Sequence, residues 1–259
     1  MRIDWDPDGY LAFAEPRLRP ALDLLARVPL DRAGTVVDLG CGPGNLVPRL
    51  RGRFPRATIV AVDNSPDMLA RARAAHPDVA FVEADLASWE PEAPVDLIFS
   101  NAALQWLDDH RQLFPRLMGF LRPGGVLAVQ MGNNSRAVSH RLVGEIARDG
   151  PWAERLRTRF RPLPDLSMAA YYGWLAPCTA ELDIWETEYL HALEGDEPVF
   201  HWTRSSTLLP ALVHLGEDEA NAFVARYRAS LRRAYRLEPD GRTLFPFRRI
   251  FIVARRTGT

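Results

Sequence analysis

Several features that define whole classes of protein are scarce or missing in this chain. Its 259 residues include no lysine and only two cysteines, and the formal net charge is −1. Two cysteines are too few for a disulfide framework, and neither has the His or Cys neighbours of a zinc site. We therefore expect a reduced compartment and no structural metal.

Long apolar runs and an excess of positive charge are missing as well. A nearly neutral chain has no sequence-wide attraction to nucleic acid, and no apolar stretch is long enough to span a membrane. Residues 1–4 do not begin a signal-peptide pattern. These features predict a cytoplasmic protein, by default a monomer, that binds neither nucleic acid nor membrane. The basic residues are all arginine, whose planar forks suit carboxylates.

Strand and helix patterns alternate as far as residue 131. Short runs of β-branched residues are separated by amphipathic segments, which is typical of βαβ units in a parallel sheet. Ser65 and Pro66 are predicted to begin a helix as its N-cap and first residue, and Arg122–Gly125 is predicted to be a turn before the fifth strand. The five predicted strands are Thr35–Leu39, Thr58–Val62, Val79–Val82, Val95–Phe99 and Val126–Gln130.

The alternation breaks after residue 131, where proline-separated helical patterns predict an inserted cap. A strand over Leu182–Leu193 and two helices follow, and aromatic residues at steps of four in the second helix indicate core packing. The last strand, Ile250–Ala254, is apolar on both faces and should lie inside the sheet. We predict one α/β, Rossmann-like domain with a mostly parallel seven-stranded sheet, helices on both faces and a helical cap inserted in the C-terminal half. Its predicted parts are lid helices at 1–30, a cofactor-binding core at 31–131, a cap at 132–180 and 194–244, and final strands at 181–193 and 245–256.

A glycine turn follows the first predicted strand. Gly40, Gly42 and Gly44 are spaced Gly-x-Gly-x-Gly, whereas the dinucleotide fingerprint needs its third glycine one place later, where this chain has Asn45. This spacing disfavours an NAD-dependent dehydrogenase and favours S-adenosylmethionine. That ligand has an amino-acid end and no pyrophosphate, so an acidic strand end is compatible with it. Glycine permits positive φ and close approach of the backbone to a ligand.

Ligands of open parallel sheets bind outside the carboxyl ends of the strands, and here those ends are polar. Asp63 is placed to accept hydrogen bonds from both ribose hydroxyls, although it could instead cap the next helix. Asp85 is expected to accept from the adenine amino group while Leu86 packs on the ring, although aspartate is also common in turns. Asp38 is expected to organise the glycine loop or to contact the methionine ammonium. The predicted cofactor-binding set is Asp38, Gly40, Gly42, Gly44, Asp63, Asn64, Asp85, Leu86 and Asn101.

These residues resemble the class I S-adenosylmethionine-dependent methyltransferases. The resemblance rests on the glycine loop, the acidic end of the second strand, Asp85 and the segment Leu121–Gly125, and it covers roughly the first half of the chain. A narrower likeness to carboxyl methyltransferases of that family extends over nearly the whole chain and is weakest at 150–165. It is carried chiefly by Asp4–Pro7, Tyr10–Leu11, Arg17–Ala21, Asp96–Leu107 and Phe251–Arg256.

The resemblance implies methyl transfer to one carboxylate of a small tricarboxylic acid, giving a monomethyl ester and S-adenosylhomocysteine. A carboxylate, with a pKa of about 4, is already ionised at neutral pH, so we expect neither a general base nor a metal. No catalytic proton-transfer residue is therefore predicted. Arginine forks and aromatic walls are candidates for holding the acid, although any one arginine could equally be a surface residue. The predicted substrate-binding set is Tyr10, Arg17, Arg19, Gln105, Trp106, Gln130, His140, Tyr171, Tyr172, Trp202 and Arg249.

Two further interpretations of the sequence stay open. The acceptor could be another small acid or a ubiquinone-like molecule, because the glycine loop identifies a superfamily and not a substrate. The chain could also bind S-adenosylmethionine without catalysis and act through protein partners.

Overall fold

A single seven-stranded sheet organises the structure, a computed structural model that describes residues 14–160 and 166–258. The strand order is β3-β2-β1-β4-β5-β7-β6, with β1 to β5 parallel and β7 antiparallel to β5. The predicted Rossmann-like sheet is therefore confirmed, and the last strand lies inside it as predicted. The strands are β1 (Thr35–Leu39), β2 (Thr58–Asp63), β3 (Ala80–Glu83), β4 (Val95–Asn101), β5 (Leu121–Gly132), β6 (Thr179–Leu193) and β7 (Thr243–Arg256).

The chain forms two compact units. The sheet unit comprises residues 18–132, 166–187 and 249–258, and the helical unit comprises residues 14–17, 133–160 and 188–248. Strands β6 and β7 each begin in one unit and end in the other. Helix α8 (Met168–Leu175), which the sequence analysis assigns to the cap, belongs to the sheet unit.

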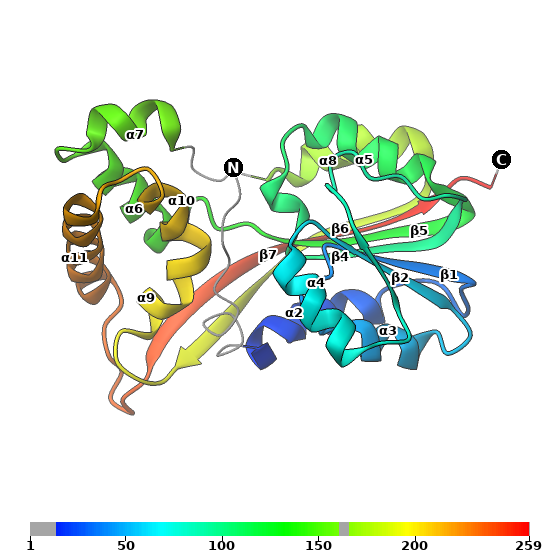
Figure 1. Cartoon of the computed structure of the whole chain (residues 1–259), viewed down its shortest axis with the longest axis horizontal. Helices are drawn as coiled ribbons and strands as arrows, with labels where there is room; N and C mark the ends of the chain where they lie inside the picture. Colours follow the sequence, from blue (N-terminus) through cyan, green and yellow to red (C-terminus); the bar gives the residue numbers. More distant parts are fainter. Residues whose placement is uncertain (1–13, 161–165, 259) are drawn as a thin grey trace. The chain divides into compact units, whose positions relative to one another are not determined.

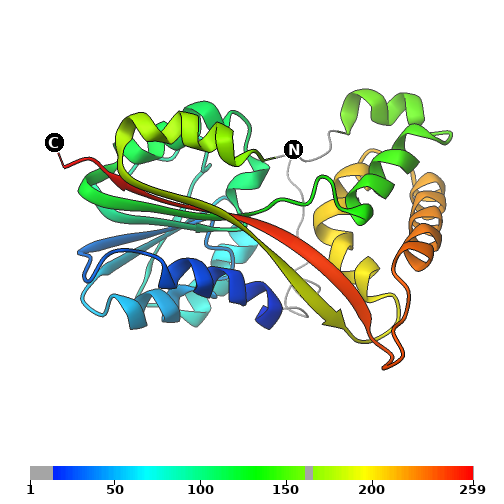
Figure 2. The same cartoon turned by 180° about the vertical axis from the view of Figure 1, so that it is seen from behind.

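Helices cover both faces of the sheet in the sheet unit. Figures 1 and 2 show α2 (Ala14–Ala26), α3 (Val47–Arg53) and α4 (Pro66–Ala75) on one face, and α5 (His110–Gly119) and α8 on the other. The inner strands β1 and β4 are buried on both sides, which explains why their sequences are nearly continuous apolar runs. The 3₁₀ turns η1 (Leu104–Trp106) and η2 (Ala176–Cys178) follow β4 and α8.

The fifth strand departs from the prediction. The segment Arg122–Gly125, predicted as a turn before the strand, lies within β5. Val95 of β4 pairs with Leu121 and Leu97 pairs with Val126, so these four residues bulge out opposite a single residue of β4. Gly124 has a φ of 77°, a conformation that costs glycine little. Turn-forming residues therefore produce a bulge here without ending the strand.

The helical unit has its own aromatic core. The stripe predicted in the last helix is confirmed, because Phe223 and Tyr227 of α11 are fully buried and pack with Trp152 and Phe245. The indole N–H of Trp152 donates to the carbonyl of Ile146 at 2.7 Å, which satisfies its one polar group. The helices of this unit are α6 (Val138–Arg148), α7 (Ala153–Arg159), α9 (Pro198–Thr203), the π-helical η3 (Arg204–Leu208), α10 (Leu209–Leu212) and α11 (Glu217–Ala234).

Across residues 14–160 and 166–258, we find no helix that combines the length and the apolar character needed to cross a membrane.

Candidate functional site

Strand register places the polar ends of β2, β1 and β4 on one face of the sheet. Asp38 pairs with Ala61 of β2 and with Phe99 of β4. Laterally paired residues point to the same face, and so do residues two apart along one strand. Asp63 and Asn101 each lie two residues beyond a partner of Asp38, so the three side chains share a face.

The same face continues through β5 and β7. Asn101 pairs directly with Gln130, and Gly132, two residues further along β5, pairs with Arg249 of β7. Gln130 is fully buried and Arg249 is 6% exposed. Polar residues from five adjacent strands are thus aligned where β1, β2, β4 and β5 end, at the edge where ligands of such sheets bind. This alignment brings together Asp63, Asp38, Asn101, Gln130 and Arg249 of the predicted site.

Asp63 holds the glycine loop against the end of β2. Its Oδ2 accepts the backbone N–H of Gly42 at 2.8 Å, and its Oδ1 accepts that of Ser65 at 2.9 Å. The Ser65 hydroxyl in turn accepts the N–H of Met68 at 3.5 Å, so the predicted N-cap of α4 is confirmed. Asp63 is therefore more than a candidate ribose acceptor, because it also fixes the loop that follows β1.

The glycines of the loop are needed for two different reasons. Gly40 has a φ of 83°, and a Cβ placed on it would lie 2.2 Å from the Cβ of Ala103. Gly42 has a φ of 54°, and beyond its chain neighbours no described atom lies within 4 Å of a Cβ placed there. Gly40 thus permits close packing within the protein, whereas Gly42 leaves open space that a ligand can enter.

Asp38 is a fully buried carboxylate at the end of β1. Its side chain has no exposure, and neither carboxylate oxygen has a hydrogen-bond partner among the described residues. Burial, and secondarily the negative charge of Asp63, raise the pKa of Asp38 to about 7. A buried charge is costly unless it is paired, so this site suits a ligand that supplies a cationic N–H donor. The ammonium of an amino-acid end has that chemistry.

Several buried amide atoms of β4, η1 and β5 also have no hydrogen-bond partner within the described part of the chain. These atoms are the side-chain oxygens of Asn101 and Gln105 and both polar atoms of the Gln130 amide. Buried polar atoms of this kind are uncommon in folded proteins and mark places where a water or a ligand completes the hydrogen bonds. The cluster therefore offers both donors and acceptors to a polar ligand.

The turn after β3 presents Asp85 and Leu86. Asp85 is exposed, and its Oδ1 accepts the N–H of Ala87 at 2.9 Å, as in an Asx turn. Leu86 is buried, and its Cδ1 would lie 3.3 Å from a Cβ on Gly40, so the turn packs against the glycine loop. Asn64 is exposed between β2 and α4. Within the sheet unit, the adenine candidates are therefore adjacent to the loop.

The 3₁₀ turn η1 places Gln105 and Trp106 after β4. The Gln105 amide donates to the carbonyl of Ala102 at 2.7 Å, and Ala102 has a φ of 56°, which is uncommon for a residue other than glycine. The Nε2 of His110 lies 2.9 Å from the carbonyl of Leu104, which can only accept, so Nε2 carries the proton. His110 is not among the residues predicted from the sequence, because no local pattern marks it.

Of the predicted tyrosine pair, Tyr171 packs in the core and Tyr172 is 62% exposed. The hydroxyl of Tyr171 lies 2.6 Å from Nδ1 of His110, the nitrogen left to accept a proton, and burial lowers the pKa of His110. Arg19 is exposed and forms an ion pair with Asp23 at 3.9 Å. Tyr10 and the side chain of Arg17 lie outside the described residues.

His140 and Trp202 lie in the helical unit. The two ring nitrogens of His140 are 3.2 Å from the hydroxyl of Ser139 and 3.1 Å from that of Thr207, and burial lowers its pKa to about 4. His140 is therefore neutral at pH 7. Trp202 is 1% exposed in the aromatic core of this unit. Trp202 is therefore an interior residue, whereas His140 is half-buried.

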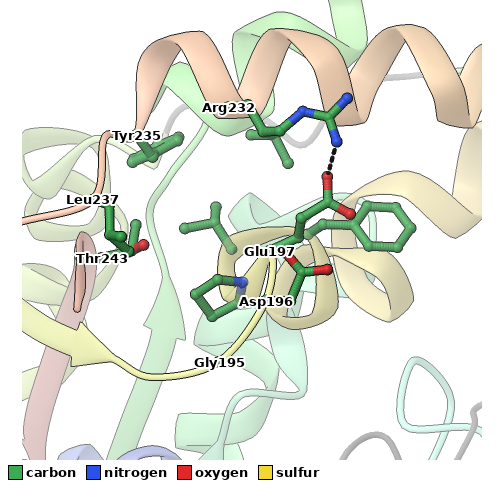
Figure 3. Close-up of a pocket in the computed structure, with 11 residues that line it drawn as sticks. Gly195, Asp196, Glu197, Arg232, Tyr235, Leu237 and Thr243 are labelled. Atoms are coloured by element: carbon green, nitrogen blue, oxygen red, sulfur yellow. Dashed lines mark hydrogen bonds and ion pairs between the residues drawn. The ribbon is translucent and has the colours of Figure 1, made fainter. Parts of the chain in front are cut away.

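A cavity of about 290 Å³ lies within the helical unit and contains none of the predicted site residues. Figure 3 shows Glu197 and Arg232 in contact at its wall, joined by an ion pair of 2.9 Å. No group of three or more His, Cys, Asp or Glu residues in the described part of the chain could hold a metal ion. Among the described residues, Asp38, Asn101, Gln105 and Gln130 of the sheet unit instead carry buried polar atoms without a hydrogen-bond partner.

Known proteins resemble this chain in sequence and in fold. Residues 36–125 match a family model described as a methyltransferase domain. The trans-aconitate 2-methyltransferase of Azoarcus sp. (strain BH72) is 51% identical over 96% of this chain and 98% of its own length. That of Methylobacterium nodulans is 50% identical over 98% of this chain and 99% of its own length. The crystal structure of YcgJ protein from Bacillus subtilis superimposes with a TM-score of 0.60 at 16% identity, covering 92% of this chain and 99% of that chain, which shows a shared fold.

Proposed function

Because the chain belongs to the trans-aconitate 2-methyltransferase family, we propose that it methylates one carboxylate of trans-aconitate with S-adenosylmethionine. The products are a monomethyl ester and S-adenosylhomocysteine. The observation that carries the cofactor assignment is Asp38, a fully buried carboxylate beside a glycine loop that leaves open space. Residues 14–160 and 166–258 offer its oxygens no hydrogen-bond partner. The confirmed family membership supports the narrower likeness drawn from the sequence, and trans-aconitate is the substrate named for the relatives.

S-adenosylmethionine, when bound, supplies a methyl group activated by a sulfonium centre. Asp38 binds the ammonium of its amino-acid end, and the open space over Gly42 admits the ligand close to the backbone. Asp63 accepts the ribose hydroxyls with the lone pairs left after it binds Gly42 and Ser65. Asp85 and Leu86 hold the adenine.

Arg249 and Gln130 are the proposed partners of the acid within the sheet unit. Both are buried on the same face at neighbouring strands. A guanidinium can form two parallel hydrogen bonds to a carboxylate. The Gln130 amide, which has no hydrogen-bond partner among the described residues, adds a donor and an acceptor. These residues orient the acid and exclude water from it.

No residue acts as a general base in this proposal. The attacking carboxylate is ionised at neutral pH, so no proton has to be removed. The rate then depends on alignment of the carboxylate oxygen with the methyl carbon and sulfur. Orientation of two reactants can contribute about 7–11 kcal/mol in favourable systems, and a site of buried side chains suits that role.

The proposal is tested by incubating the protein with methyl-labelled S-adenosylmethionine and a panel of di- and tricarboxylic acids. Products are separated before and after mild base, which cleaves an ester but not a C-methyl group. We expect base-labile label with trans-aconitate. Label on another acid, or base-stable label on a ubiquinone-like acceptor, would show a different substrate but still a methyltransferase. Binding of S-adenosylmethionine without turnover would favour a non-catalytic protein.

A further inference from the structure

Arg116 of α5 reaches across to the turn that follows β3. Its Nη1 donates to the carbonyl of Trp89 at 3.0 Å, and its Nη2 donates to those of Ala87 at 2.5 Å and Leu86 at 3.3 Å. The guanidinium also lies over the ring of Phe120, 5.3 Å from its centroid. A single side chain thus satisfies three carbonyls of one short turn.

The turn is fixed from its other end by Asp85. The backbone carbonyl of Asp85 accepts the N–H groups of Ser88 at 3.1 Å and Trp89 at 2.8 Å, and its carboxylate accepts that of Ala87 at 2.9 Å. Residues 85–89 therefore form one helical turn with an acid at its start and the Arg116 charge at its end.

We infer that Arg116 is a positioning residue for adenine recognition: by holding the carbonyls of Leu86, Ala87 and Trp89, it fixes where the Asp85 carboxylate and the Leu86 side chain meet the purine. The inference rests on the proposed function, which places adenine at Asp85 and Leu86. Without Arg116 the three carbonyls turn toward water, and the Asp85 carboxylate is no longer held at the purine amino group. Arg116 itself touches no reacting atom.

The test measures how the protein distinguishes two ligands by calorimetry. S-adenosylhomocysteine has a 6-amino group that donates to a carboxylate, whereas S-inosylhomocysteine has an oxygen there that cannot. The unmodified protein should prefer the first ligand by at least about tenfold, as expected for one hydrogen bond to a charged group. Arg116→Gln should remove most of that preference by weakening the first ligand more than the second. The KM for S-adenosylmethionine should rise while kcat at saturation changes little.

Arg122→Gln is the matched control. Arg122 of β5 also donates to a carbonyl, that of Pro94 at 3.0 Å, and contacts Asp96 at 3.4 Å. These partners lie at the start of β4, whereas the polar site residues lie at its end. The control should keep the ligand preference. If Arg116→Gln does not fold, Arg116→Lys keeps the charge and stem but has one nitrogen for three carbonyls, and it should still reduce the preference.

The Asp85→Asn variant separates positioning from general stability. When it is combined with Arg116→Gln, the double variant should lose little more affinity for S-adenosylhomocysteine than either single variant, because both changes act on one contact. Equal weakening of the two ligands by Arg116→Gln, or additive effects of the two variants, would overturn the inference. Equal binding of both ligands by the unmodified protein would also overturn the inference. The ester assay could still succeed in that case, so the proposed function would stand. Absence of methyl transfer with intact ligand preference would instead count against the proposed function alone.

Discussion

At the scale of single residues, Asp38 makes cofactor binding depend on pH. Its pKa of about 7 in the ligand-free protein exceeds the ordinary value of 3.8, so below pH 7 the carboxyl is mostly protonated. An ammonium binds the carboxylate form, so binding below pH 7 must release a proton. The affinity for S-adenosylhomocysteine should therefore rise with pH, by up to about tenfold per unit below 7, and level off above it.

Calorimetry between pH 5 and 8, in buffers of different ionisation enthalpy, counts that proton directly. Asp38→Asn should bind more weakly and lose most of the pH dependence. Asp67→Asn changes an exposed acid in the first turn of α4 and should keep the full dependence. A profile that is flat in the unmodified protein would contradict the assignment of Asp38 to the ammonium. The same pKa shift means that the ligand-free protein loses stability as pH rises from about 4 to 7, because the folded state holds a proton that the unfolded state has released.

Alanine at Gly42 and at Gly40 should have different effects on cofactor affinity and on the free energy of unfolding. Gly42→Ala meets no described atom within 4 Å beyond its chain neighbours, so it should cost only the strain of a positive φ, about 1–2 kcal/mol. Its new methyl group would occupy ligand space, and cofactor affinity should fall sharply. Gly40→Ala would place its Cβ 2.2 Å from that of Ala103, so it should destabilise the fold more. Urea unfolding and titration with S-adenosylhomocysteine check both; equal unfolding free energies for the two variants would contradict this distinction.

At the scale of elements, Glu197 joins α9 to α11. Its side chain is 6% exposed and forms ion pairs with Arg228 and with Arg232, the latter at 2.9 Å. Those arginines hold the pKa of Glu197 below its ordinary value. Glu197→Gln should lower the free energy of unfolding by about 1–3 kcal/mol, because it removes charge-assisted hydrogen bonds from a nearly buried acceptor.

The control for that prediction is Glu194→Gln, a 74% exposed acid that pairs with Arg242 at 3.0 Å. Exposed pairs contribute little, so its effect should stay below about 1 kcal/mol. Because the folded pKa of Glu197 is depressed, its stabilisation is present above the ordinary value of 4.5 and is lost as pH falls below it. The unfolding free energies of the two variants should therefore become equal in strongly acidic solution. A difference that persists there would contradict the role of charge.

At the scale of the whole molecule, the sheet could be predicted from sequence because each strand carries a local pattern. The glycine spacing and the acid at the end of β2 are also local, and they identified the loop and Asp63. The contacts of His110 with Tyr171 and of Arg116 with Trp89 join residues 61 and 27 positions apart, so no local pattern shows them. The bulge at Arg122–Gly125 was predicted as a turn because turns and bulges use the same residue types.

The proposed site binds the cofactor and the acid through different strands of the sheet, and this can be tested. Asp63 lies at the end of β2 and Arg249 lies three strands beyond β1 in the strand order, after β4 and β5. Asp63→Ala should lower the affinity for S-adenosylhomocysteine at least about tenfold, because the variant lacks the proposed ribose acceptor and releases the N–H of Gly42. Its effect on the KM for trans-aconitate should be smaller. Arg249→Ala should do the reverse.

Arg248→Ala is the matched control, because Arg248 is the exposed neighbour of Arg249 and pairs with Glu188 at 3.6 Å. It should leave both affinities unchanged. Arg249→Lys keeps the positive charge but cannot form two parallel hydrogen bonds to a carboxylate, so its KM for the acid should lie between those of the unmodified protein and Arg249→Ala. Urea unfolding confirms that each variant is folded. Equal losses of both affinities in Asp63→Ala and Arg249→Ala would mean that the strand ends bind cofactor and acid as one inseparable site.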